Sequence, residues 1–457
     1  MIPPMQSTKL HFASVLTPGG WREDVTVSAG PDGMISALTP GTVQGALRVS
    51  GIALPAMPNV HSHAHQRFML GLAERAGPGA DSFWTWREAM YGYALRLSPD
   101  DLEAVAAQLY VEMLKAGFSD VGEFQYLHHQ PDGTPYADPA EMSLRCLAAA
   151  GTAGIAITIL PTLYAHGGFG GQPPAPGQRR FINGADGFLK IVERLSIQAG
   201  SLCRVGISPH SLRAVTPPLL REVMAALPPE APIHIHVAEQ VKEVEDCLAA
   251  CRRRPVEMLL EEFDLSSRWT VIHATHMTAE ETEALARSGA ITGLCPTTEA
   301  NLGDGIFPAT DYMKAGGMIA IGSDSHITVS PAEDLRMLEY SQRLREQTRN
   351  ALASGPGQST GRTMFEAALK GGARSMCQPV GAIAPGFRCD IAVLDTEHPL
   401  LAGRKNDAAL DTWIFSGGNV LVKDVFAAGR HVVNDRRHIH EDMIARNFRR
   451  ALRRLDT

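Results

Sequence analysis

The sequence lacks the features that mark exported proteins. Its seven cysteines are an odd number and include no CxxC pair, which suits a reducing compartment and argues against a disulfide framework. The first ten residues have prolines and polar side chains where a secretory signal needs a basic start and an apolar core. We therefore expect a cytoplasmic protein.

Long hydrophobic runs and an excess of positive charge are also missing. The longest apolar stretch, residues 147–165, is interrupted by Gly151, Gly154 and Pro161, so we expect no membrane-spanning segment. The net charge of −7 gives no reason to expect nucleic acid or an anionic membrane as a partner. With 44% hydrophobic residues the chain can bury a large core. A globular protein that binds a small molecule is the expectation that remains.

Apolar runs of strand length alternate with helical segments along the middle of the chain. Near-continuous apolar strands that alternate with helices indicate parallel strands buried on both faces, and eight of them predict a closed (β/α)8 barrel of the TIM type, in the α/β class. The eight runs are Ala53–Val60, Ser119–Phe124, Ile155–Leu163, Arg204–Ser208, Pro232–Val237, Thr270–His273, Ile291–Cys295 and Met318–Gly322.

The two ends of the chain have a different pattern, with short alternating strands and turn residues. We expect residues 1–52 and 378–457 to form one small β-sandwich domain that ends in a helix, with residues 53–377 inserted between them as the barrel. The apolar residues of the tail, from His440 to Leu455, recur at helical spacing, and its five arginines fit a solvated helix face better than a nucleic-acid site.

Histidines and carboxylates gather where the predicted strands end. Active sites of such barrels lie at the C-terminal ends of the strands, and five of the eight ends carry these groups. The first strand leads into the pentad His61-Ser62-His63-Ala64-His65, in which residues two apart share one face. The other ends carry His210, the pair His234 and His236 followed by Glu239, His273, and Asp324 with His326.

These groups predict a metal site. Two imidazoles from the first strand, one from the fifth and the carboxylate of Asp324 make a four-ligand nitrogen and oxygen site suited to zinc. Such an ion lowers the pKa of water to about 7 and so predicts hydrolysis. Spacing alone does not choose between His234 and His236. The fourth and fifth strands hold no lysine to bridge two metals, so we expect one ion per subunit, with Fe²⁺ or Mn²⁺ as alternatives to Zn²⁺.

The motifs taken together resemble the amidohydrolase superfamily, in its mononuclear deaminase branch. The resemblance rests on residues 58–63 (PNVHSH), His236-x-x-Glu239, His273 and residues 322–326 (GSDSH). Within that branch the chain is similar to the formimidoylglutamate deiminases of histidine degradation over essentially its whole length. Five longer runs carry that likeness: Asn59–Met69, Phe83–Tyr91, Gly167–Phe181, Ser208–Pro217 and Thr298–Pro308.

The resemblance implies an enzyme that hydrolyses a C–N bond of a linear amidine, converting N-formimidoyl-L-glutamate to N-formyl-L-glutamate and ammonia. It implies His61, His63, His236 and Asp324 as metal ligands. It also implies Glu239, His273 and Asp324 as catalytic residues, and Gln66, Arg87, Tyr126, His210 and Arg213 as contacts to a substrate with two carboxylates. A homodimer is implied as well. Arginines suit such a substrate because their planar forks bind carboxylates with two hydrogen bonds.

Three mechanistic roles follow from this resemblance. Asp324 would accept a proton from the attacking water, Glu239 would carry protons to the leaving nitrogen, and His273 would donate a hydrogen bond to the oxygen of the tetrahedral intermediate. His65 is expected to support the ligands, and the direction in which Glu123 faces is left open. We expect the second H-x-H pair, His438 and His440, to lie far from the barrel mouth.

Two rival functions have to be weighed. The first is a deaminase or chlorohydrolase of the same branch that acts on a purine, pyrimidine or triazine ring; the two arginines, and the few aromatic residues that the strands supply, disfavour it. Arg87 could, however, only stack on the neighbouring Trp84 or Trp86. The second rival is a catalytically silent protein stabilised by a metal. It is disfavoured because a structural zinc site needs no proton-transferring groups such as Glu239 and His273.

Overall fold

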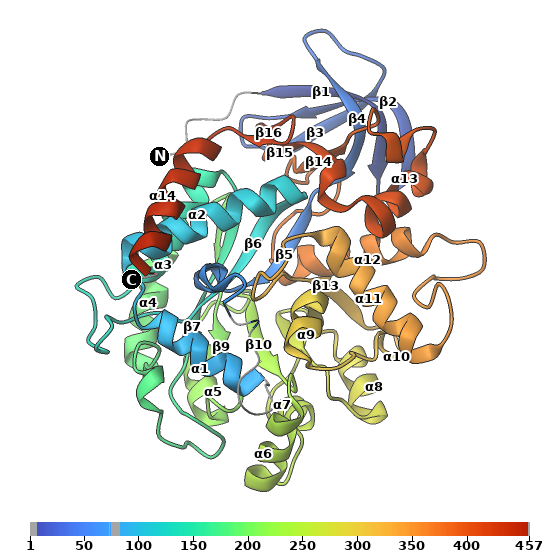
Figure 1. Cartoon of the computed structure of the whole chain (residues 1–457). Coiled ribbons are helices and arrows are strands. Elements are labelled where there is room, and N and C mark those ends of the chain that lie inside the picture. Colours follow the sequence, from blue (N-terminus) through green and yellow to red (C-terminus); the bar gives the residue numbers. More distant parts are fainter. Residues whose placement is uncertain (1–6, 73, 75–82, 456–457) are drawn as a thin grey trace.

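The structure, a computed structural model, describes residues 7–72, 74 and 83–455 of the chain. Residues 1–6, part of the segment judged to carry no secretory signal, lie outside the described range. Strands from the two ends of the chain, blue and red in Figure 1, lie together at one end of the molecule, and the barrel with its helices makes up the rest. None of the described helices is long and apolar enough to cross a membrane.

Parallel strands of the middle of the chain form the predicted barrel. In chain order they are β5 (Met57–Ser62), β6 (Phe118–Gln125), β7 (Ala156–Leu163), β8 (Cys203–Val205) with β9 (Ser208–Pro209), β10 (Ile233–Val237), β11 (Trp269–His273), β12 (Ile291–Leu294) and β13 (Met318–Ile321). They pair in the orders β5-β6-β7-β8 and β10-β11-β12-β13. Parallel bridges Ser62↔Asp324 and Ile207↔Ile233 join the two sets into a ring. The predicted (β/α)8 fold is confirmed.

The first and fourth predicted strands differ from the observed ones. The fourth, Arg204–Ser208, is divided between β8 and β9. The run Ala53–Val60 is divided between β4 (Leu47–Pro55), which belongs to the outer sheet, and β5 of the barrel. The division falls at Ala56, whose N–H donates to Asp390 O, whereas the next N–H, of Met57, donates to Gly117 O beside the barrel. The residues from Ile52 to Pro58 are all apolar, so composition alone does not indicate where one strand ends and the next begins.

The outer sheet combines both ends of the chain in the order β17-β16-β15-β14-β4-β1-β2-β3. β1 and β4 are parallel, and the other neighbours are antiparallel. A separate apolar core, which includes Leu10, Phe12 and Phe426, packs inside this sandwich-like sheet. Its boundaries at residues 52 and 378 stay predictions. The remaining strands are β1 (Thr8–Thr17), β2 (Gly20–Ala29), β3 (Ile35–Pro40), β14 (Ile391–Leu394), β15 (Val422–Ala427), β16 (Arg430–Asn434) and β17 (Arg437–His438).

Helices cover the barrel, and their ends follow ordinary capping rules. α2 (Pro99–Ala116) begins at Ser98, whose side chain accepts from the N–H of Asp101, and ends at Gly117 in the left-handed conformation. The predicted C-terminal helix is α14 (Glu441–Leu455), which packs against α2 (Figure 1). The other helices are α1 (Phe83–Ala94), α3 (Glu141–Ala153), α4 (Ala185–Ser196), α5 (Pro217–Ala225), α6 (Val241–Cys251), α7 (Pro255–Glu262), α8 (Ala279–Ser288), α9 (Pro296–Leu302), α10 (Ala309–Lys314), α11 (Pro331–Glu346), α12 (Thr360–Ser375) and α13 (Asn406–Thr412).

Candidate active site

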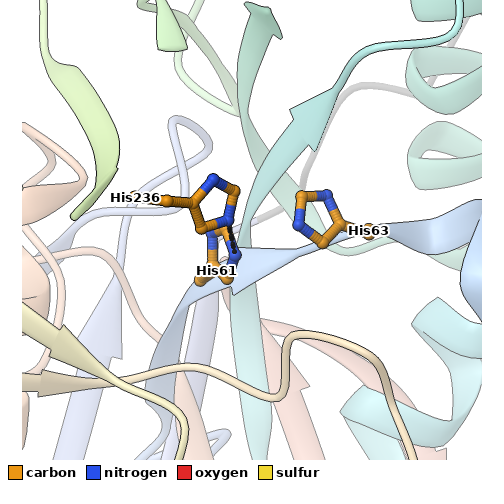
Figure 2. A group of neighbouring side chains, drawn as sticks. All are labelled: His61, His63 and His236. Atoms are coloured by element: carbon orange, nitrogen blue, oxygen red, sulfur yellow. Dashed lines mark hydrogen bonds between the residues drawn. The ribbon is translucent and has the colours of Figure 1, made fainter. Parts of the chain in front are cut away.

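Three histidines from two barrel strands converge at the barrel mouth. His61 and His63 belong to the end of β5 and its exit, and His236 projects toward them from β10 (Figure 2). Nε2 of His61 lies 3.0 Å from Nε2 of His236. Donor atoms of all three rings fall within 4.8 Å of one another, and the three residues are buried. Residues far apart in sequence thus form one cluster because the C-terminal ends of β5 and β10 open into the same barrel mouth.

Asp324 completes the cluster from the end of β13. Its Oδ1 lies 3.3 Å from His61 Nε2 and 3.5 Å from His63 Nε2. Gly322 permits this approach, because a Cβ at that position would lie 2.7 Å from the Cβ of His61 and 2.9 Å from its backbone nitrogen. The glycine of the GSDSH motif is therefore required by the packing of β13 against β5.

Hydrogen bonds fix the orientation of two of the rings. Nδ1 of His63 bonds to Phe124 O and Nδ1 of His236 bonds to His210 O. Burial lowers the pKa of all three imidazoles, so these rings are neutral near pH 7. A neutral imidazole that donates through Nδ1 has an unprotonated Nε2. Two such nitrogens, a third imidazole and a carboxylate around one point form a donor set that fits a divalent metal ion.

The residues that the sequence left open lie in three different places. His234 is buried one layer deeper in the barrel, where its Nε2 bonds to Ser375 O at 3.1 Å, so His236 and not His234 faces the cluster. His65 bonds through Nε2 to the hydroxyl of Tyr126 at 2.8 Å. Glu123 accepts hydrogen bonds from the Ser62 hydroxyl and from the N–H of Ala64, and burial raises its pKa to about 7. Glu123 therefore fixes the segment His61–His65 through the side chain of Ser62 and the backbone of Ala64.

Glu239 and His273 meet beside the cluster. Nε2 of His273 lies 3.7 Å from Glu239 Oε1 and 3.8 Å from Asp324 Oδ2. Burial raises the pKa of Glu239 to about 7, against the opposing effect of His273. Burial alone would lower the pKa of His273, but Glu239 and the other carboxylates around it raise the value to about 10. The site therefore favours the cationic form of the His273 imidazole, which lies between the carboxyl groups of Glu239 and Asp324.

A pocket connects this cluster to all five predicted substrate contacts. It is lined by Gln66, Arg87, Tyr126, His210 and Arg213 together with His63, His236, Glu239, His273 and Asp324. The side-chain amide of Gln66 donates to the Tyr126 hydroxyl at 3.0 Å. The structure thus brings the predicted residues together, and their individual roles stay predictions.

The two arginines of the pocket share one aromatic neighbour. The guanidinium carbon of Arg87 lies 4.5 Å from the ring centroid of Trp84, and that of Arg213 lies 5.7 Å from it. Each arginine has a buried Nε without a hydrogen-bond partner among the described residues. Arg213 is only 8% exposed, and the carboxylate of Glu243 approaches its Nε to 3.9 Å. Arg87 therefore stacks on Trp84, as the alternative reading proposed, and also lines the pocket.

The strands supply few aromatic side chains to the pocket, as expected, but the pocket as a whole is rich in them. They come from α1 and from the loops that follow the strands, not from the strands themselves, and they are Phe83, Trp86, Tyr91, Tyr126, Tyr164 and Phe181. The Gly-rich segment 167–177 leads to Gln178, whose amide donates to the Tyr164 hydroxyl at 2.7 Å. Helical spacing of the buried residues Phe83, Met90 and Tyr91 in α1 is the signal that would have found several of them.

The second H-x-H pair lies away from this pocket, as expected. His438 is in β17 of the outer sheet, and its Nε2 bonds to Ala153 O at the end of α3. His440 is exposed and directly precedes α14. Neither residue lines the pocket.

Comparison with known proteins places the chain in a family. A model of the amidohydrolase family matches residues 52–432. The chain belongs to the amidohydrolase family. The match confirms the predicted superfamily. The metal dependence of that family agrees with the converging histidines of this chain.

Individual relatives of this amidohydrolase cover nearly its whole length. It is similar to a formimidoylglutamate deiminase of Pseudomonas aeruginosa, with 52% identity over 96% of this chain and 97% of the relative. The crystal structure of an amidohydrolase from Brucella melitensis matches with a TM-score of 0.93 and 48% identity, over 98% of this chain and 100% of that one. An adenosine deaminase from Xanthomonas campestris with bound zinc matches with a TM-score of 0.82 and 20% identity, over 99% and 100% of the chains. That last likeness concerns the fold alone.

Proposed function

We propose that this amidohydrolase is a zinc-dependent deiminase that hydrolyses N-formimidoyl-L-glutamate to N-formyl-L-glutamate and ammonia. The observation that carries the proposal is one pocket in which a set of metal-ligand side chains and two guanidinium groups face the same space. The similarity to a formimidoylglutamate deiminase over 96% of the chain supports it. A place in histidine degradation stays a prediction that accompanies it.

His61, His63, His236 and Asp324 are the residues that would hold the ion. Their nitrogen and oxygen donors suit zinc, and the alternatives Fe²⁺ and Mn²⁺ bind similar donor sets. When bound, such an ion supplies a nucleophile at neutral pH by lowering the pKa of water to about 7.

Three side chains of the site can manage the protons of the reaction. Asp324 would accept a proton from the attacking water, and Glu239, across from it, would deliver protons to the nitrogen that leaves as ammonia. His273 lies within 3.8 Å of both carboxylates, a position from which its Nε2–H would donate to the oxygen of the tetrahedral intermediate. The separation of these roles rests on the resemblance, and the short distances among the three groups are compatible with it.

The arginines supply the charge that a substrate with two carboxylates requires. Arg87 of α1 and Arg213, which follows β9, both line the pocket, and both guanidinium groups lie near the ring of Trp84. A planar guanidinium binds a carboxylate through two parallel hydrogen bonds. Gln66, Tyr126 and His210 would provide further polar contacts between the arginines and the reacting carbon.

Turnover of candidate substrates tests the proposal. The purified, zinc-loaded protein is incubated with N-formimidoyl-L-glutamate and, separately, with guanine and cytosine, while ammonia release is followed and products are identified by mass. We expect ammonia and N-formyl-L-glutamate from the first substrate alone. Because aromatic side chains also line the pocket, turnover of guanine or cytosine instead would establish the ring-directed alternative. If none reacts although zinc is bound, the substrate assignment from Arg87 and Arg213 is wrong.

Two further properties remain part of the proposal. The cysteine content supports a cytoplasmic location. The homodimer rests on the resemblance alone.

A further inference from the structure

A carboxylate outside the predicted site contacts the catalytic histidine from behind. We propose that Glu299 of α9 is a positioning residue: its carboxylate accepts a hydrogen bond from Nδ1 of His273, fixes the orientation of that ring toward the pocket and supports the positive charge of the imidazole. The inference rests on the proposed function for the role of His273, and it adds a residue that the sequence motifs did not single out as functional.

The contact is direct and buried. Nδ1 of His273 lies 3.1 Å from Glu299 Oε1, on the side of the ring away from Glu239 and Asp324. The exposed fraction is 1% for His273 and 5% for Glu299. The same Oε1 also accepts a hydrogen bond from the backbone N–H of Cys295 at 2.9 Å. The carboxylate is thus fixed at the start of α9 while it faces the imidazole.

This geometry decides which nitrogen of His273 carries a proton. A carboxylate only accepts hydrogen bonds, so the proton of the Glu299 contact belongs to Nδ1 of His273. Nε2, which faces the pocket, carries a proton only while the ring is cationic. A cationic ring can donate from Nε2 to a developing oxyanion, and the carboxylate behind it stabilises that cation.

The backbone at His273 is fixed by its own conformation and hydrogen bonds, so only the orientation of the side chain remains to be set. Its φ is 69° and that of Ala274 is 49°, both in the left-handed region that non-glycine residues rarely adopt. The N–H of Ala274 donates to Val237 O, which ties this turn to the end of β10. The strand end is therefore fixed, and the Glu299 contact sets the remaining rotation and protonation of the imidazole.

Removing the charge of Glu299 while keeping its hydrogen bonds separates its electrostatic effect on His273 from its effect on the orientation of the ring. In Glu299→Gln the amide oxygen stays toward the N–H of Cys295, so it still accepts from Nδ1 of His273, but the negative charge is gone. We expect kcat to fall about ten- to 100-fold, as is usual when a carboxylate that supports a functional histidine is lost, with KM within about threefold of the wild-type value. Glu299→Leu also removes the acceptor, so it should lose more activity.

Asp304 provides a matched control in the same segment. It is a buried carboxyl that follows α9, and its Oδ1 accepts from the side-chain amide of Gln240. Burial and the charge of Glu239 raise its pKa to about 9, so it is uncharged near pH 7. Asp304→Asn preserves the acceptor without changing the charge, and we expect its kcat to stay within twofold of the wild type.

A spectroscopic measurement tests the contact without any substrate. A buried Nδ1–H that donates to a carboxylate gives a proton resonance far downfield of the amide signals. We expect one such resonance in the wild-type protein and in Asp304→Asn, and its loss in His273→Asn and Glu299→Leu. Metal content and the thermal unfolding midpoint of each variant are measured in parallel.

The outcomes separate the two proposals. An inactive wild-type protein that shows the His273 resonance contradicts the proposed substrate but supports the Glu299 contact. Loss of kcat in both Glu299 variants and of the resonance in Glu299→Leu, with metal content and KM retained, supports the positioning role. The role is overturned if Glu299→Gln keeps its kcat, if no resonance depends on both residues, or if activity falls only together with metal content or thermal stability.

Discussion

The backbone is left-handed at three residues that end barrel strands at the site. Ala238 after β10, His273 at the end of β11 and Asp324 after β13 have φ values of 50°, 69° and 48°. Such conformations cost on the order of 1 to 3 kcal/mol for a non-glycine residue and persist only where the surrounding structure enforces them. Two of these three positions carry proposed catalytic side chains, so the strain accompanies the turn that aims them into the mouth.

His128 illustrates how buried, neutral histidines make stability depend on pH. Its Nε2 bonds to Thr162 O at 2.8 Å, and burial lowers its pKa from 6.5 to about 4. The folded state therefore binds this proton less readily than the unfolded chain. The contribution is fully present above pH 6.5 and is lost as the pH falls toward 4, by about 3 kcal/mol in all.

We expect His128→Gln to flatten the pH dependence of the free energy of unfolding in this window, as measured by urea denaturation between pH 7 and about 4. The exposed His440, replaced in the same way, is the control. Equal slopes for the His128 variant and the wild type would contradict the assignment.

For single residues, the sequence predicted which side chains belong to the site better than it predicted how far each lies from the barrel mouth. Alternation along a strand placed His61 and His63 on one face correctly, but His234 and His236 share a face as well. Only the distance of each from the barrel mouth separates them, and that distance depends on how neighbouring strands are staggered. Glu299 was not found either, because a glutamate in a short helix carries no spacing pattern that relates it to a histidine 26 residues earlier.

Among the elements, β5 and β13 approach each other unusually closely at the site. Gly322 of β13's exit faces the backbone of His61 with room for a hydrogen only. We expect Gly322→Ala to push these strand ends apart, which would move Asp324 away from His61 and weaken metal binding at least tenfold while the fold is retained. Metal affinity measured by competition with a chromogenic chelator checks this.

Gly151 in α3 is the matched control, because a Cβ there meets nothing within 4 Å. Gly151→Ala should leave metal affinity unchanged and raise stability by about 0.5 to 1 kcal/mol, as is common for a helical glycine. If both variants bind metal as tightly as the wild type, the packing argument for Gly322 is wrong.

The elements themselves were predictable where periodicity was strong. The capped helix from Pro99 to Ala116 and the tail helix follow from local residues alone. The division of the run Ala53–Val60 between two sheets did not follow, because the residues on both sides of the break, 52–55 and 57–58, are apolar. What separates them is the change of hydrogen-bond partner at Ala56, which depends on strands more than 60 residues away and near the other end of the chain.

For the whole molecule, a buried ionic cluster joins the outer sheet to the barrel. Arg388 donates from Nη2 to Asp120 of β6 at 2.7 Å and from Nε to Asp390 at 2.8 Å. All three residues are buried. Even beside this cation, burial raises the pKa of Asp120 to about 6, which indicates how poorly the site would tolerate an unpaired carboxylate.

Arg388→Met would leave two buried carboxylates without their partner, and we expect it to lower the free energy of unfolding by about 3 to 5 kcal/mol at pH 7. Urea denaturation followed by circular dichroism measures the change. Arg287→Met removes an exposed pair with Glu283 and should have little effect. If both variants lose a comparable amount of unfolding free energy, burial of the Arg388 cluster does not explain the loss.

The pairing of β4 with β14 has a consequence for how the protein is made. Pro55 lies opposite Ile391 in this sheet, so the open edge of β4 has no partner until the chain near residue 391 has left the ribosome. At about 5 to 20 residues per second, that wait lasts on the order of 20 to 70 seconds. An unpaired strand edge is a site of association between chains. Nascent chains of this protein should therefore need protection by chaperones during that interval.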